Sequence, residues 1–281
     1  MELTLPEYST IQLQVKNALA EDVGKDDLTA RLIDDSKIVT AEIICRSNTI
    51  LCGSKWVDET FQQVDNATTI QWNYTDSENV SAESILCSIT GLAQQILTGE
   101  RTALNFLQLL CATATSTRQY VQAVQGTSCK ILDTRKTIPG LRLAQKYAVR
   151  CGGGVNHRIG LYDMVLIKEN HIAAAGSIKS AVARSIKLNP GIPVEVEVET
   201  LQELEQALKC KVERIMLDNM SIETLNQAVK ITAGKIPLEA SGGVSLDTVK
   251  EIAETGVDYI SIGEITKNIY AVDLSLRITG I

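Results

Sequence analysis

The chain has 281 residues, of which 44% are hydrophobic and 22% are charged. This composition excludes a disordered or collagen-like chain, and the length suits one large domain or two. The 27 Lys and Arg against 34 Asp and Glu leave a net charge of −7, which argues against a surface for nucleic acid or anionic lipid. The sequence has no apolar run long enough to predict a membrane span, and Met1 to Pro6 lack the pattern of a secretion signal. We therefore expect a cytoplasmic protein.

The first hundred residues have the pattern of an α+β domain. β-rich runs predict antiparallel strands over 39–46, 69–74 and 85–89, and helices are expected over 10–21 and 54–64. A long helix is predicted over 99–125, with Ala103, Leu107, Leu110 and Ala114 on one face. We assign residues 1–110, joined by 268–281, to this domain and residues 111–267 to a second domain.

From residue 130 onward, short β-rich runs alternate with helical stretches. The predicted strands cover 130–132, 164–167, 194–198, 214–217, 237–240 and 259–262, and the predicted helices cover 141–150, 177–188, 201–210, 222–233 and 246–255. This spacing suits right-handed parallel crossovers, which build either a barrel or a doubly wound sheet.

Polar or glycine residues follow nearly every predicted strand, and their position favours the barrel. These segments are Asp133-Thr134-Arg135-Lys136, Lys168-Glu169-Asn170-His171, Glu197 with Glu199, Asp218-Asn219, Ser241-Gly242-Gly243 and Gly263-Glu264. In a (β/α) barrel all carboxyl ends open onto one mouth, so these groups converge, whereas an open sheet scatters most of them. We predict an α/β fold with an incomplete (β/α) barrel, because only six strands are plain.

Residues 129–168 hold eight Lys and Arg against two Asp, although the whole chain is acidic. Part of this excess, the i, i+4, i+8 series Arg142, Lys146 and Arg150, is typical of a solvated helix face. Four other cations follow a strand or a glycine loop: Arg135, Lys136, Arg158 and Lys168. They either form structural ion pairs or converge on an anion with several charges, such as a carboxylate or phosphate compound.

The last two loops after strands carry a possible phosphate site. Ser241, Gly242, Gly243 and Gly263 would leave backbone amides open to a phosphate, at the loops where barrels often bind one. The alternative for the Ser-Gly-Gly segment is an ordinary tight turn.

Carboxylates end two neighbouring predicted strands. Glu197 and Asp218 would suit Mg²⁺ beside a phosphate. Glu195, Glu197 and Glu199 share one strand face, which must meet cations, metal or water, unless the strand lies at a wet edge of the sheet.

The two histidines and seven cysteines give weaker signals. His157, next to Arg158 after three glycines, is a candidate ligand contact, and His171 is expected to be structural. The cysteines are odd in number and form no Cys-x-x-Cys pair, so we expect reduced, mostly buried thiols rather than disulfides or zinc ligands.

Taken together, these motifs resemble the quinolinate phosphoribosyltransferase family, the carboxylating nicotinate-nucleotide pyrophosphorylases. The resemblance spans nearly the whole chain and is most specific over 133–171. The segments that carry it are Glu21-Asp22-Val23-Gly24, Glu100-Arg101-Thr102-Ala103-Leu104-Asn105, Asp133-Thr134-Arg135-Lys136-Thr137, Lys146-Tyr147-Ala148-Val149, Gly152-Gly153-Gly154, Asn156-His157-Arg158, Leu166-Ile167-Lys168-Glu169-Asn170-His171, Glu195-Val196-Glu197-Val198-Glu199, Leu217-Asp218-Asn219, Ser241-Gly242-Gly243 and Glu254-Thr255-Gly256-Val257-Asp258.

The resemblance implies a homodimer that converts quinolinate and phosphoribosyl pyrophosphate, with Mg²⁺, into nicotinate mononucleotide, pyrophosphate and CO₂. It implies that the two quinolinate carboxylates contact Arg135, His157, Arg158 and Lys168, with Arg101 reaching in from the other subunit. Lys136, with Thr134 in the same motif, would hold the pyrophosphate-bearing substrate. Glu197 and Asp218 would face the ribose hydroxyls and the metal, and the 5′-phosphate would lie against Ser241, Gly242, Gly243, Gly263 and Glu264. Lys136, Glu197 and Asp218 are the implied catalytic residues.

The chain departs from the family pattern at a few positions. Asp26 stands where Gly is frequent, Glu264 where a small residue is usual, and Lys267 where His is frequent. A carboxylate at position 264 would repel a phosphate unless the side chain points away from it.

Two other functions fit parts of the sequence. Lys168, at a strand end, could be the Schiff-base amine of a lyase or aldolase. A non-catalytic pyridine-nucleotide sensor or a paralogue for a different ring acid is the other alternative, although a sensor predicts a broken site and every key position is filled.

Overall fold

The computed structural model describes residues 4–280, which divide by their contacts into two units. The first unit comprises the residues up to Arg118, Thr137–Gly153 and the residues from Ile265, and the second comprises Gln119–Lys136 and Gly154–Glu264. Of the predicted segment 268–281, Ile281 lies outside the described residues. The sequence boundary between 110 and 111 assigned 137–153 to the barrel domain, whereas their contacts group them with the first unit.

A four-stranded antiparallel sheet forms the centre of the first unit. Its order is β12 (Leu274–Gly280), β1 (Ile38–Cys45), β5 (Ile85–Leu92) and β3 (Thr69–Trp72). Buried and partly exposed residues alternate along β1, so the sheet has one buried face. That face contributes Ile43 and Ile89 to an apolar core shared with Leu107 of α3.

Several helices and short strands complete the first unit. They are α1 (Tyr8–Asp22), the 3₁₀ turn η1 (Ala30–Leu32), β2 (Thr49–Ile50), α2 (Ser54–Val64), β4 (Asn79–Val80) and α4 (Arg142–Cys151). Helix α4 buries Tyr147 and Ala148 in a second apolar cluster with Trp56 and Ile11. This packing explains why residues 137–153 group with the first unit.

Helix α3 (Ala93–Ala123) is longer than predicted and begins six residues before Gly99. Gly99 lies inside the helix and packs closely against Phe61 of α2. A Cβ at position 99 would come within 2.8 Å of a ring carbon of Phe61. The glycine therefore permits close packing against α2 rather than marking the start of a helix.

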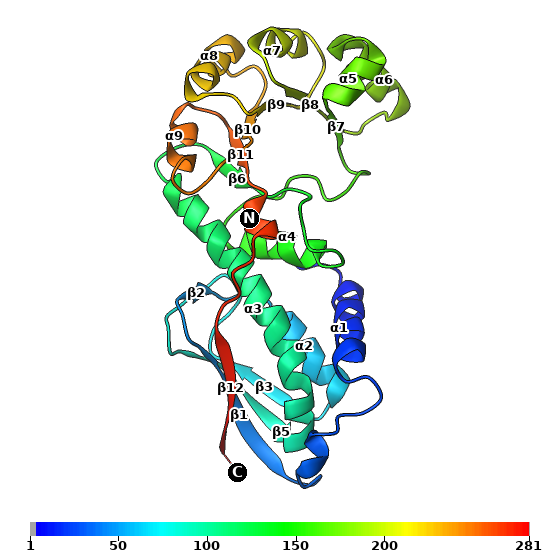
Figure 1. Cartoon of the computed structure of the whole chain (residues 1–281), viewed down its shortest axis with the longest axis vertical. Helices are drawn as coiled ribbons and strands as arrows, with labels where there is room; N and C mark the ends of the chain where they lie inside the picture. The colour runs from blue at the N-terminus through cyan, green and yellow to red at the C-terminus, as the bar shows by residue number, and fades with distance from the viewer. Residues whose placement is uncertain (1–3, 281) are drawn as a thin grey trace. The chain divides into compact units, whose positions relative to one another are not determined.

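A six-stranded parallel sheet forms the second unit, in the order β6 (Lys130–Leu132), β11 (Tyr259–Ser261), β10 (Leu238–Ser241), β9 (Arg214–Asp218), β8 (Val194–Val198) and β7 (Val165–Ile167). The strands follow one another in an arc, with helices α5 to α9 on its outer side (Figure 1). These helices are α5 (Glu169–Ala175), α6 (Ile178–Leu188), α7 (Leu201–Ala207), α8 (Ile222–Thr232) and α9 (Val249–Glu254), and the short α10 (Glu264–Lys267) follows β11. Within residues 4–280, β6 and β7 pair with no strand that would close the ring, so the predicted incomplete barrel is confirmed.

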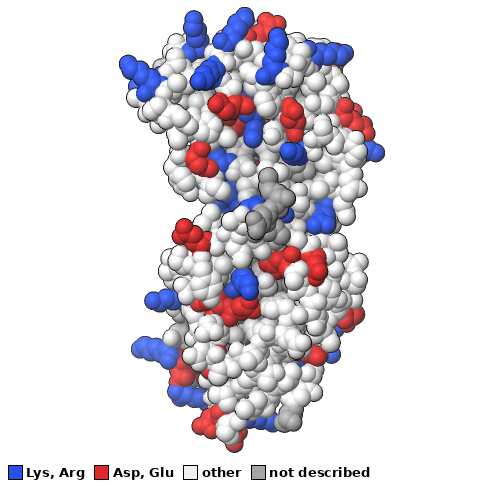
Figure 2. Space-filling model, turned by 180° about the vertical axis from the view of Figure 1, so that it is seen from behind, with Lys and Arg blue, Asp and Glu red and all other residues white. Residues whose placement is uncertain are grey.

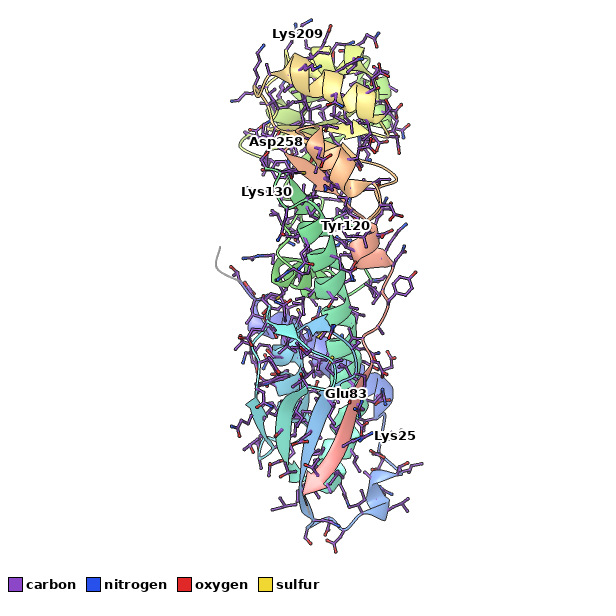
Figure 3. The ribbon with its side chains drawn as sticks, turned by 90° about the vertical axis from the view of Figure 1, so that its left-hand side faces the viewer. Lys25, Glu83, Tyr120, Lys130, Lys209 and Asp258 are labelled. Atoms are coloured by element: carbon purple, nitrogen blue, oxygen red, sulfur yellow. The ribbon has the colours of Figure 1, made fainter. Side chains whose placement is uncertain are left out.

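Asp258 connects the amino ends of three barrel strands. Its backbone oxygen accepts a hydrogen bond from the amide of Lys130 at 2.9 Å, and its Oδ2 accepts one from the amide of Leu238 at 2.8 Å. Asp258 and Lys130 are both labelled in Figure 3. Hydrogen bonds therefore fix the amino end of the sheet. The candidate functional groups follow the strands at the opposite, carboxyl end.

The mixture of surface charges and the state of the cysteines agree with what the sequence predicts. Lys and Arg are interspersed with Asp and Glu on the face drawn in Figure 2, so neither sign of charge covers it. All seven cysteines are free; six are buried and Cys210 is partly exposed. No helix within the described part of the chain has both the length and the apolar composition needed to cross a bilayer.

Candidate active site

Charged side chains line the inner face of the barrel sheet. Glu195 and Glu239, on β8 and β10, are fully buried, and Glu197 and Ser241 lie two residues further along the same strands. Alternate residues of a strand share a face, so each pair points to the same side of the sheet. Since β8 lies between β7 and β9 and all five of its residues are buried, the alternative of a wet edge strand is wrong.

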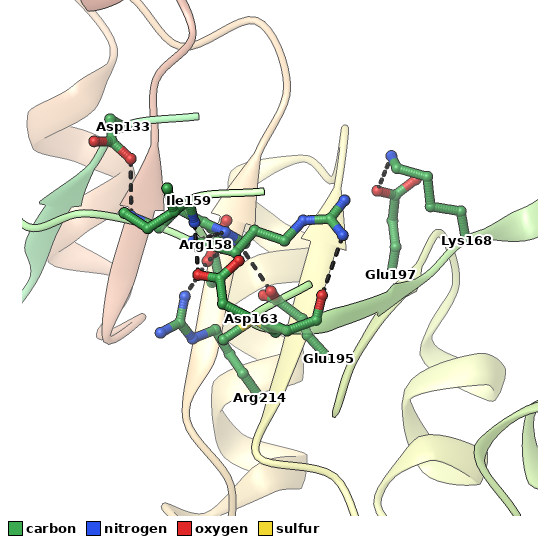
Figure 4. A network of polar contacts seen from close by, with 11 residues as sticks. Asp133, Arg158, Ile159, Asp163, Lys168, Glu195, Glu197 and Arg214 are labelled. Carbon is green, nitrogen blue, oxygen red and sulfur yellow. Dashed lines mark hydrogen bonds and ion pairs between the residues drawn. The ribbon is translucent and has the colours of Figure 1, made fainter. Parts of the chain in front are cut away.

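The loop after the Gly-Gly-Gly segment is held by side chains from three strands. At the end of β6, Asp133 accepts hydrogen bonds from the His157 amide at 2.8 Å and from Asn156 Nδ2 at 2.6 Å. Nε2 of His157 lies 2.9 Å from Glu195 Oε2 and 3.4 Å from Glu239 Oε2. Asp133 and Glu195 of this network are labelled in Figure 4.

Arg158 lies in a partly buried, electrically positive environment. Burial, and after it the charge of Arg135, lowers the pKa of the Arg158 guanidinium. The Arg158 side chain also donates to the backbone oxygen of Met164 at 3.2 Å. Guanidinium groups in such an environment suit an anion.

Lys168 reaches the same sheet face from the end of β7. Its Nζ lies 2.5 Å from Glu197 Oε2, and Lys168 is also the N-cap of α5. His171 Nδ1 accepts a hydrogen bond from the Lys168 amide at 3.0 Å, which confirms the structural role expected for His171. A Schiff-base lysine must be a neutral amine, whereas Lys168 is paired with a carboxylate.

At two glycines of the last two loops, Gly242 and Gly263, neighbouring atoms leave little room for a side chain. Gly242 has φ +103°, and a Cβ there would collide with Oδ1 of Asn219. A Cβ at Gly263 would lie 2.9 Å from Cδ of Lys136, which follows β6 and donates its backbone amide hydrogen to Thr134 Oγ1 at 3.0 Å. The structure therefore brings Thr134, Lys136 and Gly263 together, as a phosphate site at this end of the barrel requires.

Glu264 points its carboxylate at a phenol. Tyr120 of α3, labelled in Figure 3, donates its hydroxyl hydrogen to Glu264 Oε1 at 2.5 Å. Burial, and after it the hydrogen bond to Glu264, raises the pKa of Tyr120. This contact occupies the carboxylate of Glu264, which stands where the family pattern has a small residue.

The deeper carboxylates have altered acidity. Burial raises the pKa of Glu195, and Arg214 is the largest influence in the opposite direction. Burial, and after it the charge of Glu195, raises the pKa of Glu239 to about 7. Such shifts occur where ionisable groups are packed together away from water, and they are typical of functional sites.

Comparison with known proteins identifies the family that carries this arrangement. The model of the quinolinate phosphoribosyl transferase C-terminal domain matches residues 113–277, and that of the N-terminal domain matches residues 26–111. The chain belongs to the quinolinate phosphoribosyl transferase family.

Relatives of this family match the chain over nearly its full length. A protein of Bacillus subtilis described as a probable carboxylating nicotinate-nucleotide pyrophosphorylase is 39% identical over 272 residues, which cover 95% of this chain and 94% of the relative. The solved nicotinate-nucleotide pyrophosphorylase of Francisella tularensis is 47% identical with a TM-score of 0.97, and 99% of each chain is covered. NadC from Streptococcus pyogenes is 36% identical with a TM-score of 0.96 over 99% of each chain.

One expectation about the basic stretch of this family member is wrong. Lys146 is only 2% exposed, and α4 is buried continuously from Ala144 to Val149. The interpretation as a solvated face is therefore wrong for Lys146, whereas Arg142 and Arg150 are partly exposed. The i, i+4, i+8 spacing of charges fixes a common helix face but not what that face contacts.

Arg101 belongs to the first unit, on α3. It lies exposed on α3, 3.9 Å from Glu100. The role implied for it involves a partner subunit.

Sequence reasoning missed several residues that shape the family's site here. Asp133 holds the 156–158 loop, Glu239 faces His157, and Arg214 contacts Glu239 at 2.7 Å. Asn219 adopts a left-handed backbone with φ 52° beside Gly242. The available signal was a charge in the middle of an apolar strand. It applies to Glu239, but it was used only for Glu195 and Glu197 of β8 and for Glu199 directly after that strand.

Proposed function

We propose that this chain is a quinolinate phosphoribosyltransferase, a decarboxylating pentosyltransferase of de novo NAD biosynthesis. The substrates are quinolinate and phosphoribosyl pyrophosphate, and the products are nicotinate mononucleotide, pyrophosphate and CO₂. The observation that carries the proposal is a set of charged groups at the carboxyl ends of the barrel strands in a member of this family: Lys168 Nζ lies 2.5 Å from Glu197 Oε2, and Lys136 lies beside Gly263. Together with the guanidinium groups of Arg135 and Arg158, these cations suit a small dicarboxylate beside a phosphate.

The diacid is gripped by the cations of the site. Arg135 and Arg158 offer guanidinium forks for one carboxylate or both, and Lys168 adds a point charge. Substrate arrival partly replaces the pairing of Lys168 with Glu197, which frees that carboxylate to turn toward the ribose. This grip fixes the pyridine nitrogen in position to attack the sugar.

The phosphoribosyl substrate lies across the last loops of the barrel. The 5′-phosphate binds the backbone amides at Ser241, Gly242, Gly243 and Gly263. Lys136, with Thr134 beside it, holds the pyrophosphate. Glu264 contributes to the shape of this loop while its carboxylate stays with Tyr120, so its charge is directed to the phenol.

Mg²⁺ is the proposed metal, and the donor set fits a metal that is carried mainly by the substrate. Glu197 already contacts Lys168, and Asp218 Oδ2 accepts a hydrogen bond from Asn219 at 2.7 Å. Among residues 4–280, the clusters of three possible ligands include neither of these carboxylates. One or two carboxylates with substrate phosphates is the usual arrangement for Mg²⁺. The bound ion would neutralise charge on the departing pyrophosphate.

The protein has little covalent work to do. As the C1–O bond to pyrophosphate breaks, Lys136 stabilises the leaving group, and Glu197 or Asp218 offsets positive charge on the ribose. The pyridine nitrogen forms the new bond to C1. The alkylated ring then accepts the electron pair of the breaking bond between C2 and its carboxylate, CO₂ leaves, and C2 takes a proton.

The enzyme acts as a cytoplasmic homodimer in which Arg101 reaches the partner's site. Large apolar side chains are exposed at Leu28, Leu32, Leu161 and Tyr162, each at least 74% exposed, and such residues suit a covered surface. Seven free thiols suit a reducing compartment. Light scattering of the purified protein, and activity of an Arg101→Ala variant mixed with an inactive Lys168→Ala variant, test this arrangement.

Release of labelled CO₂ from carboxyl-labelled quinolinate tests the reaction. We expect release only with phosphoribosyl pyrophosphate and Mg²⁺ present, together with formation of nicotinate mononucleotide. Release without the sugar substrate, or no release at all, would contradict the proposal. Borohydride treatment should trap no adduct on Lys168.

A further inference from the structure

Four ionisable side chains are buried together on the inner face of the barrel sheet. We call His157, Glu195, Glu239 and Arg214 the buried cluster. The side chains of His157 and Arg214 are 6% and 16% exposed, and both carboxylates are fully buried. The proposed reaction gives no part to Glu195, Glu239 or Arg214. Burying such groups is costly, and apolar side chains often fill the same space with equal stability, so the cluster calls for a functional explanation.

Both ring nitrogens of His157 are engaged within the protein. Nδ1 accepts a hydrogen bond from the amide of Arg158 at 2.7 Å, so it carries no proton. Nε2 faces Glu195 and Glu239. The imidazole therefore lies between the backbone of Arg158 and the two buried carboxylates.

The surroundings of Arg158 disfavour the positive charge of its side chain. Arg135 repels it, and burial disfavours its charge, whereas Glu195 attracts it. Glu195 thus supplies negative charge beside the Arg158 guanidinium before the substrate arrives. A site whose charges are already oriented binds its ligand without reorganisation.

Glu239 is itself fixed from the next strand. Arg214 Nη1 lies 2.7 Å from Glu239 Oε2, and the Arg214 guanidinium stands 4.3 Å from the centre of the Tyr259 ring. Arg214 thereby neutralises the second carboxylate and holds it in place against His157.

We propose that Glu239, held by Arg214, is a positioning residue that fixes Arg158 through His157 and so prepares the site for the diacid. The inference rests on the proposed function and deepens it, since it assigns diacid affinity to residues that do not touch the substrate. The phosphoribosyl end of the site depends on other loops and should be unaffected.

Two variants separate positioning from structural stability. Glu239→Gln keeps an acceptor for Arg214 and His157, whereas the double variant Arg214→Met with Glu239→Leu replaces the ion pair by apolar groups that should still fold. A matched control is Glu59→Gln, which alters a buried glutamate of the first unit that contacts Tyr8 and Gln63. KM for quinolinate, KM for phosphoribosyl pyrophosphate and kcat are measured for each, with circular dichroism for folding.

The double variant should raise KM for quinolinate roughly 10- to 100-fold while KM for phosphoribosyl pyrophosphate changes less than about threefold, because displacing a binding group by about 1 Å has effects of this size. Glu239→Gln should retain most of the affinity, and Glu59→Gln all of it. An active wild type with a folded double variant of unchanged quinolinate KM would overturn the inference, as would equal increases in both KM values. A wild type without quinolinate turnover would instead overturn the proposed function.

Discussion

The two sheets of this protein bury opposite kinds of surface. The antiparallel sheet of the first unit packs hydrocarbon side chains such as Ile43 and Ile89 against α3. The inner face of the parallel sheet holds Glu195, Glu239 and Arg214, with His157 beside them. An apolar face stabilises a fold at little cost, whereas a charged interior reduces stability unless each charge is compensated. The difference indicates that the first unit is built for stability and the second for binding anions.

The largest effect should come from removing a cation of the site. Arg135→Ala and Lys168→Ala should each lower kcat/KM by about 100-fold or more, since one lost charged donor has this effect in other active sites. Both variants should keep the wild-type circular dichroism spectrum. Lys179→Ala, which alters an exposed lysine of α6, serves as the control and should leave turnover unchanged. Normal activity of either site variant would remove that residue from the site.

A truncation in the first unit should show the reverse pattern. Ile43→Ala removes a fully buried side chain and should destabilise the protein by about 2–5 kcal/mol, because it leaves a cavity in the apolar core. Both KM values should stay constant below the unfolding temperature. Ile38→Ala, at the exposed start of the same strand, should change the free energy of unfolding by less than about 0.5 kcal/mol. A large change of either KM value in Ile43→Ala would contradict the view that the antiparallel sheet stabilises the fold without shaping the site.

The phosphate loop offers a test with a matched glycine. Gly242→Ala should raise KM for phosphoribosyl pyrophosphate roughly tenfold, because the new Cβ would displace Asn219 and shift the amides of the loop. Gly191→Ala has a similar positive φ of +82° with open space around it, so it carries the backbone strain without the collision. If the two variants have the same KM, the loop does not depend on the close approach of Asn219.

A smaller effect should appear in the pH dependence of stability. The pKa of Glu239 is raised to about 7 by burial and by Glu195, so its protonated form is favoured in the folded state. Its contribution is fully present below the ordinary carboxyl pKa of about 4.5 and is lost as the pH rises through about 7. The free energy of unfolding of Glu239→Gln should therefore fall less steeply than that of the wild type between pH 5 and 8. Parallel curves from urea unfolding would show that Glu239 is ionised throughout.

The sequence predicted the architecture well because the βα period and the polar residues after each strand follow from backbone geometry. The parallel sheet and the polar segments at its carboxyl ends needed only that geometry. The start of α3 was predicted at Gly99, six residues too late, and nothing local reveals that Phe61 packs on that glycine. Burial of Lys146 was missed for the same reason, since spacing along a helix does not say what the helix packs against.

The partners of His157 were beyond the reach of sequence reasoning. Glu239 lies 82 positions further along the chain, and its contact with His157 depends on how β10 and β8 are placed in the sheet. A single sequence without an alignment carries no trace of such a contact. A charged residue inside an apolar strand is the one clue available, and it indicates a buried ionic contact without naming the partner.

Cys210 has a practical consequence for these experiments. Six of the seven thiols are buried, and Cys210, just after α7, is partly exposed. A maleimide fluorophore should therefore react there first and give a nearly uniform conjugate without mutagenesis.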